Sequence, residues 1–468
     1  MLNQFNVSLW GDEAFSAILS MKPVSQIISI ISRDTSPPLY NITEHIWFRF
    51  FGTSEIAIRL LSFLYFLIAI FFVYKIGSFL FSRRIGLLGA VMTFFNPFFF
   101  VYAFEGRMYS ILAAGVAASM YFFARIIFSK NSLDAKDLVG YILSTTWALY
   151  SHHFSIFALL VQGLWFLIIL VSGKKKIAFS PQSGLFIFKS FIIIGILYIP
   201  WMVPLYNQTQ MVGSGFWLGK PNLADLRNLI YKYLAEGINH PLSKLSLYLV
   251  LLVLVLRRWS RNVKKSLFLV SWFLGPIILT WAVSQKFQSV FFDRYLLYTI
   301  PAATLLLSSN ARKYTGIVLA VIIPLFLLID YNYFIYPTKR PFRELAAYVK
   351  EVKRGDDFLV NWNSSSHHLW ESKYYGIPAP IYIPSGNQLP FFVGTALMEP
   401  GDVINKFPDR VQNWPNRDLP AGRQGKPPKI QRIGVITSGN VDEIKLAGYT
   451  IEETKTFGDL KFAWYKAP

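Results

Sequence analysis

The chain has 468 residues, of which 53% are hydrophobic and only 15% are charged, and its mean hydropathy is +0.39. Because soluble proteins usually carry about 25% charged residues, this composition indicates a membrane protein and argues against a soluble globular fold. The formal net charge is +20, but most basic residues lie in short segments between apolar runs, so membrane topology explains them better than nucleic-acid binding. The chain has no cysteine, which excludes disulfides and thiol chemistry.

Two adjacent carboxylates, Asp12 and Glu13, precede the first long apolar run of the chain. Residues 14–51 are themselves apolar enough to suggest a membrane span, but Lys22 and Pro23 interrupt them. A span at this position would also reverse the side of the membrane on which every later basic loop lies. We therefore predict helices that lie on the outer membrane surface.

Ten apolar runs, most of them about long enough to cross a bilayer, follow this segment. They cover roughly residues 58–80, 86–104, 108–128, 138–150, 154–171, 185–204, 243–256, 266–283, 295–309 and 315–330. The connecting segments alternate between rich and poor in Lys and Arg. The basic set holds Arg83, Arg84, Lys130, Lys136, Lys174, Lys175, Lys176, Arg257, Arg258, Arg261, Lys264, Lys265, Arg312 and Lys313. Since such loops stay in the cytoplasm, we expect ten transmembrane helices with both Asp12 and the C-terminus outside.

The centres of the apolar runs are almost free of ionisable side chains. Arg59, Lys75, Arg125 and Lys189 lie near the ends of runs, where long side chains can reach the membrane interface. The polar clusters GDEAFS, RDTSPPLY, FEGRMYS, LYSHHFS and FDRYLLY all map to the outer face. This distribution concentrates the ionisable side chains in one extracytoplasmic layer, as a reaction on a lipid headgroup requires.

From about Tyr336 onward the composition becomes that of a soluble domain. Residues 340–356 predict an amphipathic helix with Gly355 just past its end. Beyond it, strand-like and helix-like segments alternate, which is typical of a small α/β domain. We expect strands at 357–362, 379–384 and 432–438, helices at 365–376 and 441–449, and a flexible Gly/Pro-rich loop at 413–431.

The predicted fold class is therefore a polytopic α-helical membrane protein. It has about ten transmembrane helices, several interfacial helices and a small C-terminal extracytoplasmic α/β domain. We assign residues 1–335 to the transmembrane domain, with its first extracytoplasmic loop at 8–57, and residues 336–468 to the α/β domain. We find no internal repeat in the chain.

The order of the motifs along the chain resembles a known family. The stretches DEAFS, DTSPPLY, FFGTSEIAIRLLS, YAFEGRMYSILA, LYSHHFSIF and RYLLYTIPA follow each other as in the polyprenol-phosphate-sugar-dependent glycosyltransferases. These enzymes are the protein mannosyltransferase-like members of the C superfamily, and the resemblance extends over roughly residues 8–310. Members use an Asp, usually followed by Glu, in the first extracytoplasmic loop as the catalytic carboxylate, which implies Asp12 with Glu13 beside it.

The resemblance also implies roles for residues in the later motifs. Arg is well suited to binding the phosphate of a polyprenyl-phosphate donor, and the candidates are Arg107 and Arg294. The substrate-binding residues that it implies are Asp34, Glu105, Tyr109, His152 and Tyr295. The family resemblance implies no certain cofactor and leaves a divalent cation open.

Structural alternatives exist for each of these residues. Asp12 and Glu13 could simply favour the first turn of the helix that follows, where acidic residues interact well with the helix dipole. Glu105 and Arg107 could form an ion pair in a tight interhelical loop, and His152 could be a hydrogen-bonded structural residue at a helix boundary. His367 and His368 are expected to be ordinary helix residues rather than metal ligands, since no carboxylate or Cys spacing accompanies them.

The chain departs from the family pattern at three points. Ser36 stands where members commonly have His in D-x-H-P-P, and His153 stands where they usually have an aromatic residue. Members also have a transmembrane helix before the Asp-Glu loop, whereas only eleven residues precede Asp12 here, so either the chain is truncated at its N-terminus or its start was misassigned.

The leading hypothesis is an integral-membrane inverting glycosyltransferase of the plasma membrane. It moves a sugar, mannose or a similar hexose or pentose, from a polyprenyl-phosphate donor to an extracytoplasmic lipid, polysaccharide or protein acceptor. Its expected partners are that donor, the acceptor and membrane lipids, without nucleic acid. The alternatives are a transporter or flippase of lipid-linked sugars, and an inactive member that only binds them. Transporters usually show repeats or polar groups at the membrane midplane, and this sequence shows neither.

Overall fold

The computed structural model describes residues 2–129, 134–171, 181–256, 263–362, 366–407, 430–446 and 448–467. The chain divides into two compact units. Met1–Phe5 and Val24–Tyr336 form the first, which we call the helical unit, and Asn6–Pro23 and Pro337–Pro468 form the second, the α/β unit. The basic residues Lys130, Lys174, Lys175, Lys176, Arg257, Arg258 and Arg261, and residues 413–429 of the predicted loop, lie outside the described residues.

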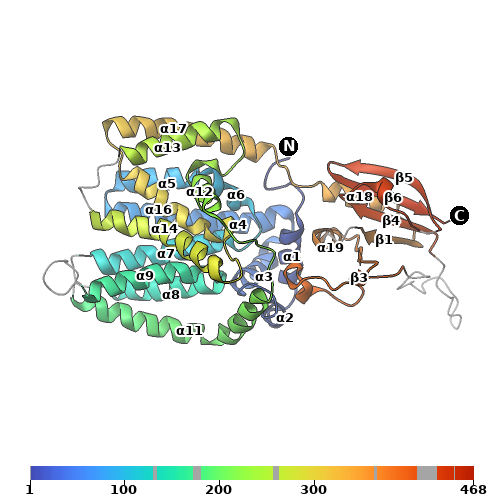
Figure 1. The fold of residues 1–468 in the computed structure, drawn as a ribbon, viewed down its shortest axis with the longest axis horizontal. Coiled ribbons are helices and arrows are strands. Elements are labelled where there is room, and N and C mark those ends of the chain that lie inside the picture. The colour runs from blue at the N-terminus through green and yellow to red at the C-terminus, as the bar shows by residue number, and fades with distance from the viewer. Residues whose placement is uncertain are drawn as a thin grey trace. The chain divides into compact units, whose positions relative to one another are not determined.

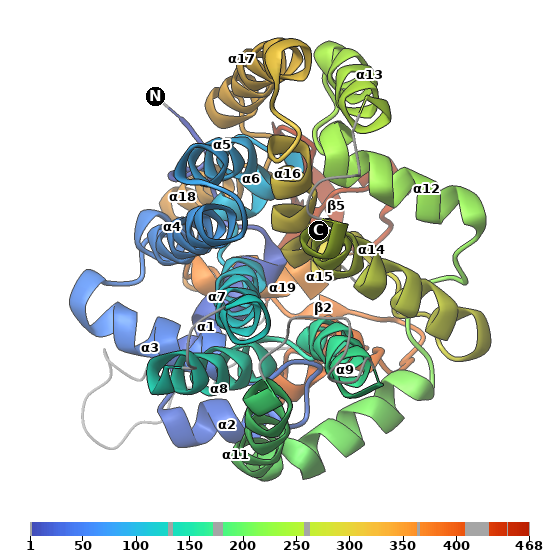
Figure 2. The same ribbon diagram turned by 90° about the vertical axis from the view of Figure 1, so that its left-hand side faces the viewer.

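Helices make up the helical unit almost entirely, and Figure 1 labels most of them. They are α2 (Val24–Ile31), α3 (Leu39–Phe51), α4 (Glu55–Leu80), α5 (Arg83–Phe94), α6 (Pro97–Val101), η1 (Tyr102–Phe104), α7 (Tyr109–Phe128), α8 (Ala135–Ser151), α9 (Ser155–Val171), α11 (Pro181–Gly213), α12 (Leu223–Tyr231), η2 (Lys232–Glu236), α13 (Pro241–Val255), α14 (Val263–Lys286), α15 (Asp293–Leu296), η3 (Leu297–Thr299), α16 (Ile300–Ser308) and α17 (Lys313–Ile335). Each of the ten predicted apolar runs falls mainly on one or more of these helices. Figure 2 shows α4, α5, α7 and α9 nearly end-on, so the axes of these helices are roughly aligned, either parallel or antiparallel.

Five helices are long and apolar enough to cross a membrane: α4, α7, residues Gly184–Gly213 of α11, α14 and α17. Two bent pairs also pass this test when each pair is joined, the first bent by 60° between α5 and α6 and the second by 99° between η2 and α13. Length and composition therefore support five to seven spans among the described residues. The ten crossings that the loop charges predict stay a prediction, because α8 and α9 have only 17 residues each and α16 has nine.

Close packing of α4 against α5 depends on glycine. A Cβ added to Gly86 would lie 2.5 Å from the carbonyl oxygen of Tyr74, and one added to Gly77 would lie 2.7 Å from the Cα of Gly86. Small residues let membrane helices approach in this way and gain packing energy. A buried hydrogen bond of 2.6 Å between the hydroxyls of Thr93 and Thr304 joins α5 to α16 nearby.

The prediction for Arg59 is wrong. We expected its side chain to reach the membrane interface, but the residue is fully buried, and Nη1 donates a hydrogen bond of 3.2 Å to the carbonyl oxygen of Phe5. The N-terminal segment packs against α4 at this point, and its main chain satisfies the guanidinium in place of water. A hydropathy profile does not contain this contact, because the two residues lie 54 positions apart.

The predicted interruption at Lys22 and Pro23 is confirmed, since α1 (Gly11–Ser20) ends before it and α2 begins after it. With α3 these helices have 10, 8 and 13 residues. Each is shorter than a membrane span requires. Their placement on the outer membrane surface stays a prediction.

The α/β unit contains one six-stranded sheet, in the order β3-β2-β1-β4-β6-β5. The strands are β1 (Asp357–Asn361), β2 (Ile381–Tyr382), β3 (Val403–Ile404), β4 (Arg432–Thr437), β5 (Thr450–Phe457) and β6 (Leu460–Lys466). The first four pair in parallel, whereas β6 is antiparallel to β4 and to β5. The longer helices of the unit are α1, α18 (Phe342–Val352) and α19 (Ser366–Tyr374). The predicted strands at 357–362, 379–384 and 432–438 are thus confirmed, although the second pairs over two residues only.

One element of the predicted α/β domain is wrong and one was missed. The expected helix at 441–449 forms only a 3₁₀ turn at Val441–Glu443. Gly448 has a φ of 78°, which ends any helix there, and Ile444 and Leu446 are buried in the core. The missed element is the hairpin of β5 and β6, whose tight turn contains Gly458 at a φ of 58°.

Candidate active site

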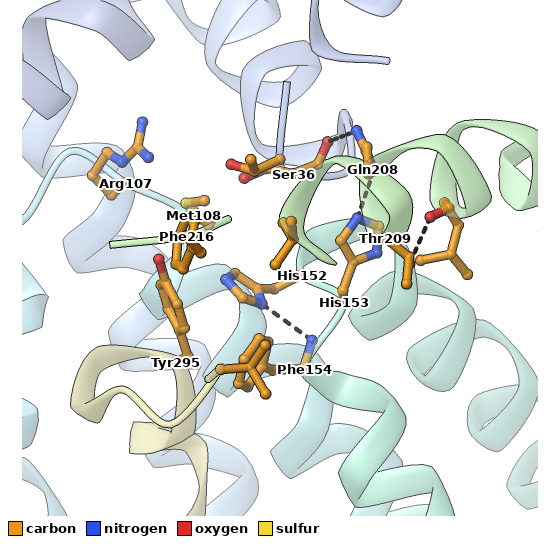
Figure 3. A pocket seen from close by; sticks show the side chains of 14 residues that line it. Ser36, Arg107, Met108, His152, His153, Phe154, Gln208, Thr209, Phe216 and Tyr295 are labelled. Carbon is orange, nitrogen blue, oxygen red and sulfur yellow. Dashed lines mark hydrogen bonds between the residues drawn. The ribbon is translucent and has the colours of Figure 1, made fainter. Parts of the chain in front are cut away.

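A cavity of about 180 Å³ lies in the helical unit, where several loops meet α11 (Figure 3). Its lining comes from the segment before α3, the turn before α7, the α8–α9 connection, α11 and the segments near α15. The lining residues are Thr35, Ser36, Arg107, Met108, His152, His153, Phe154, Leu205, Gln208, Thr209, Val212, Phe216, Val290 and Tyr295. Three of them, Arg107, His152 and Tyr295, are residues that the family resemblance implied.

Arg107 takes its position from a tight turn between η1 and α7. Its backbone N–H donates a hydrogen bond of 2.7 Å to the carbonyl oxygen of Glu105. The hydroxyl of Ser110 closes the same turn with a hydrogen bond of 2.7 Å to the carbonyl oxygen of Tyr102. The FEGRMYS motif therefore folds locally so that its arginine lines the cavity.

Aromatic rings and a second arginine gather beside His152. The ring of His152 lies 4.9 Å from that of Tyr295 and 6.5 Å from that of Tyr109, measured between centroids. The guanidinium carbon of Arg294 lies 5.6 Å from the centroid of Tyr109 and 4.9 Å from that of Phe292. The structure thus brings Arg107, Arg294, Tyr109, His152 and Tyr295 into one neighbourhood, although they come from three separate motifs.

The electrostatics of His152 favour the neutral imidazole. Burial is the main cause that lowers its pKa well below the usual value, and His153, Arg107 and Arg294 lower it further. Its Nδ1 accepts a hydrogen bond of 3.1 Å from the backbone N–H of Phe154, so the proton of the neutral ring is assigned to Nε2. His152 can therefore donate one hydrogen bond toward a ligand without adding a charge.

The charge of the cavity suits an anion. Arg107 lines it, Arg294 precedes the lining residue Tyr295, and no Asp or Glu occurs among the described residues that line it. The neighbouring carboxylate, Asp293, is engaged elsewhere, because it lies 2.6 Å from Nζ of Lys232 and accepts a hydrogen bond from the backbone N–H of Arg294. Arginine forms bidentate hydrogen bonds with phosphate, so this arrangement can hold a phosphate group.

A network that the sequence analysis did not find lines the other side of the cavity. Nε2 of His153 and Oε1 of Gln208 are 2.7 Å apart, and Nε2 of Gln208 donates to the carbonyl oxygens of Ile31 at 2.8 Å and Ser36 at 3.3 Å (Figure 3). Burial lowers the pKa of His153 to about 4, so this ring is neutral too. Gln208 thereby connects α11 to two loops, and the residue that replaces the family histidine, Ser36, is one of its partners.

Asp34 and Glu105 do not line the cavity themselves. Both are buried, and each lies within two residues of a lining residue. Asp34 belongs to the turn after α2, where its backbone N–H donates to the carbonyl oxygen of Ile31 at 3.1 Å. A contact of either carboxylate with substrate stays a prediction.

Asp12 and Glu13 belong to the α/β unit, in the first turn of α1. Glu13 is fully buried, and its Oε2 lies 2.9 Å from Nζ of Lys339 and accepts the backbone N–H of Trp10 at 3.4 Å. Asp12 keeps a quarter of its side chain exposed, with Oδ1 3.8 Å from Nδ1 of His367. Glu13 is thus held by contacts within the α/β unit, whereas Asp12 is partly exposed, and a catalytic role of either stays a prediction.

The described residues contain no group of three or more His, Cys, Asp or Glu side chains that could hold a metal ion.

Residues 35–201 match the family model described as dolichyl-phosphate-mannose-protein mannosyltransferase. No curated protein matches the chain. The resemblance that the motifs indicated, to polyprenol-phosphate-sugar-dependent glycosyltransferases, is confirmed.

Solved structures share the fold over nearly the whole chain. The crystal structure of ArnT from Cupriavidus metallidurans in the apo state has a TM-score of 0.64 at 11% identity, covering 98% of this chain and 95% of that one. The same protein bound to undecaprenyl phosphate has a TM-score of 0.60 at 11% identity, covering 99% and 95%. The Archaeoglobus fulgidus oligosaccharyltransferase in complex with Zn and sulfate reaches 0.49 at 13% identity, covering 74% and 54%, which is too remote to inform the site.

Proposed function

We propose that this protein is an inverting glycosyltransferase that moves a sugar, mannose or a similar hexose or pentose, from a polyprenyl-phosphate donor to an acceptor outside the cytoplasm. The acceptor is a lipid, a polysaccharide or a protein. The observation that carries the proposal is the cavity that Arg107 lines and Arg294 adjoins, with the neutral His152 between aromatic rings.

The charges of the cavity explain the choice of a phosphate-linked donor. As the bond between the sugar and its phosphate breaks, negative charge grows on the leaving polyprenyl phosphate. Two guanidiniums stabilise this charge more in the transition state than in the intact donor, which is the condition for catalysis. One of the ArnT structures is bound to undecaprenyl phosphate, which supports a carrier lipid of this kind for this fold.

The acceptor side of the reaction needs a group that removes a proton. In a single displacement, the acceptor oxygen attacks the anomeric carbon opposite the phosphate, which inverts the configuration, while the hydroxyl proton is lost to a base. We assign the carboxylate on which this step depends to Asp12, because it leads the Asp-Glu pair of the family motif and its side chain is accessible. Glu13 supports α1 through Lys339.

The proposed location is the plasma membrane, with the active site and the α/β unit outside. The alternation of basic and non-basic loops supports this orientation. Neither the family model nor the shared fold favours the alternative of a transporter of lipid-linked sugars.

Purified protein incubated with mannosyl-phosphoryl-undecaprenol and a membrane extract as the source of acceptors tests this function. We expect release of free undecaprenyl phosphate, with the sugar recovered on an acceptor. The double variant Arg107→Ala/Arg294→Ala should lose this release, whereas Arg227→Ala, which removes an exposed arginine of α12, should keep it. If neither mannosyl nor pentosyl donors release undecaprenyl phosphate, the proposed function is wrong.

A further inference from the structure

Three consecutive residues at the start of α1 surround one histidine of α19. The ring of Trp10 stacks on that of His367, with centroids 5.5 Å apart and an interplanar angle of 27°. A Cβ added to Gly11 would lie 2.2 Å from Nδ1 and 2.4 Å from the Cα of His367, so glycine is required for this approach. Oδ1 of Asp12 then lies 3.8 Å from Nδ1. Trp10, Gly11 and Asp12 thus all contact or adjoin the imidazole of His367.

The geometry of the ring leaves its second nitrogen available. Because Nδ1 faces Asp12, Nε2 lies on the far side of the imidazole. The side chain of His367 is 46% exposed and that of Asp12 is 25% exposed, so a substrate hydroxyl can reach both. A separation of 3.8 Å is longer than a hydrogen bond, as is common for catalytic pairs before substrate tightens them.

His368, the next residue of α19, has a different environment. His368 is fully buried, and its Nε2 lies 3.2 Å from Nη1 of Arg340. Burial and then Arg340 lower its pKa to about 4. His368 is therefore held as a neutral acceptor inside the unit, and His367 is the residue that faces outward beside the carboxylate.

We propose that Asp12 and His367 act as one acid–base pair, in which Asp12 orients the imidazole and Nε2 of His367 removes the proton of the acceptor hydroxyl. This inference rests on the proposed function. The acceptor oxygen forms a bond to the anomeric carbon while the carbon–oxygen bond to the phosphate breaks. The electron pair of that bond leaves with the polyprenyl phosphate, and the hydroxyl proton passes to Nε2. Asp12 stabilises the imidazolium that forms, so Asp12 is the positioning residue of the pair.

Charged groups of the α/β unit surround the pair, and Asp12 is the carboxylate beside the imidazole. Glu13 is engaged by Lys339, and burial raises the pKa of Glu371 well above its usual value. The titratable and charged groups that face His367 and its neighbours on α19 are Asp12, Glu13, Lys339, Arg340, His368, Glu371 and Asp459. Asp459 is 58% exposed, but its Oδ2 lies 2.7 Å from Nε of Arg340, so this carboxylate is engaged in an ion pair.

Turnover of His367→Gln across pH tests the pair. In the unaltered protein, kcat should rise with pH, because Nε2 accepts the acceptor's proton only when it is unprotonated. His367→Gln should lower kcat by about 10²-fold or more, flatten this rise, and leave the donor KM nearly unchanged. His45→Gln, which removes a histidine paired with Arg49 on α3, is the matched control and should behave as the parent.

A second variant separates chemistry from folding. His367→Ala opens a space beside Trp10, and we expect added imidazole to restore part of the lost kcat, which a misfolded protein would not allow. A His367→Gln variant with the parental kcat and pH profile, or a His367→Ala variant that imidazole does not rescue, overturns the pair. In either case the parent still releases undecaprenyl phosphate, whereas failure of the parent to do so overturns the proposed function itself.

Discussion

The cavity of the helical unit and the start of α1 in the α/β unit differ in the sign of their charge. The cavity is lined by Arg107 and two buried neutral histidines, with no carboxylate among its described lining residues. The start of α1 instead presents Asp12 beside an exposed imidazole. One region suits a leaving phosphate and the other suits an acceptor's proton. The proposed donor step and the proposed acceptor step therefore depend on residues of separate compact units, so each can be tested by itself.

The first prediction is that both regions face the outside of the membrane. It is measured by whether a single introduced cysteine is labelled in intact cells or is not labelled. We expect Gly11, Ser151 and Pro400 outside, and Lys264, like Lys175 in the undescribed segment, inside. Since Gly11 is packed against His367 and Ser151 is buried, the outer cysteines belong at exposed Thr53 and Pro400, with Lys264→Cys as the inner probe. The chain has no native cysteine. An impermeant thiol reagent that labels position 264 in intact cells would reverse the topology.

The second prediction removes the negative charge beside His367. Asp12→Asn keeps the size of the side chain and should lower turnover by about 10²-fold or more. Trp10 occupies the N-cap position of α1, so Asp12 does not cap the helix. If it served only the helix dipole, Asn would cost about 0.3–1 kcal/mol of stability and leave turnover unchanged. Rates and melting temperatures of Asp12→Asn and Glu13→Gln decide this, since Glu13→Gln should affect stability more than turnover.

The third prediction changes the geometry of the cationic side while keeping its charge. Arg107→Lys and Arg294→Lys should each weaken donor use by about tenfold, because Lys cannot replace a bidentate contact and a charged hydrogen bond contributes about 1.5–3 kcal/mol. The donor KM of each variant is compared with that of Arg227→Lys, a conservative change on the exposed face of α12. Lysine variants with the parental KM would remove these arginines from the donor site.

The fourth prediction concerns a buried group of the α/β unit and is the smallest in size. The pKa of His368 is about 4 in the folded chain, below the ordinary value of about 6.5. The unfolded chain therefore binds more protons between these values, so stability from this residue is present above pH 6.5 and is lost as pH falls toward 4. His368→Gln keeps an acceptor for Arg340 without titrating, and its melting temperature should fall less over this range. Parallel curves for parent and variant would contradict the shift.

Much of the fold could be predicted from local sequence. The ten apolar runs all fall on helices, the Lys22–Pro23 break separates α1 from α2, and the strands around Leu359 and Val435 were expected. The wrong predictions concern residues whose conformation or burial depends on contacts with segments far away in the sequence. Arg59 is satisfied by the main chain of Phe5, and the segment after Glu443 packs in an extended form, which no local pattern indicates.

In the candidate site, too, local motifs predict some residues, and distant contacts determine the others. Motif order alone indicated Arg107, His152 and Tyr295, and the structure places all three at one cavity. Gln208 gave no signal, because its partner His153 is 55 positions away and glutamine is common in loops and helices. The sequence predicts only an ordinary helix residue at His367. Its neighbour in the structure, Asp12, is 355 positions away, so no local pattern connects the two residues.

The membership of α1 in the α/β unit has a consequence for biosynthesis. Residues 6–23 leave the ribosome before their partners α18, α19 and the sheet. Ser8, for example, bonds Glu344, which is made 336 residues later. Contacts between such distant segments close slowly, because the intervening chain must first be ordered. We therefore expect the segment that carries Asp12 to reach its packed position only after α18, α19 and the sheet have been synthesised.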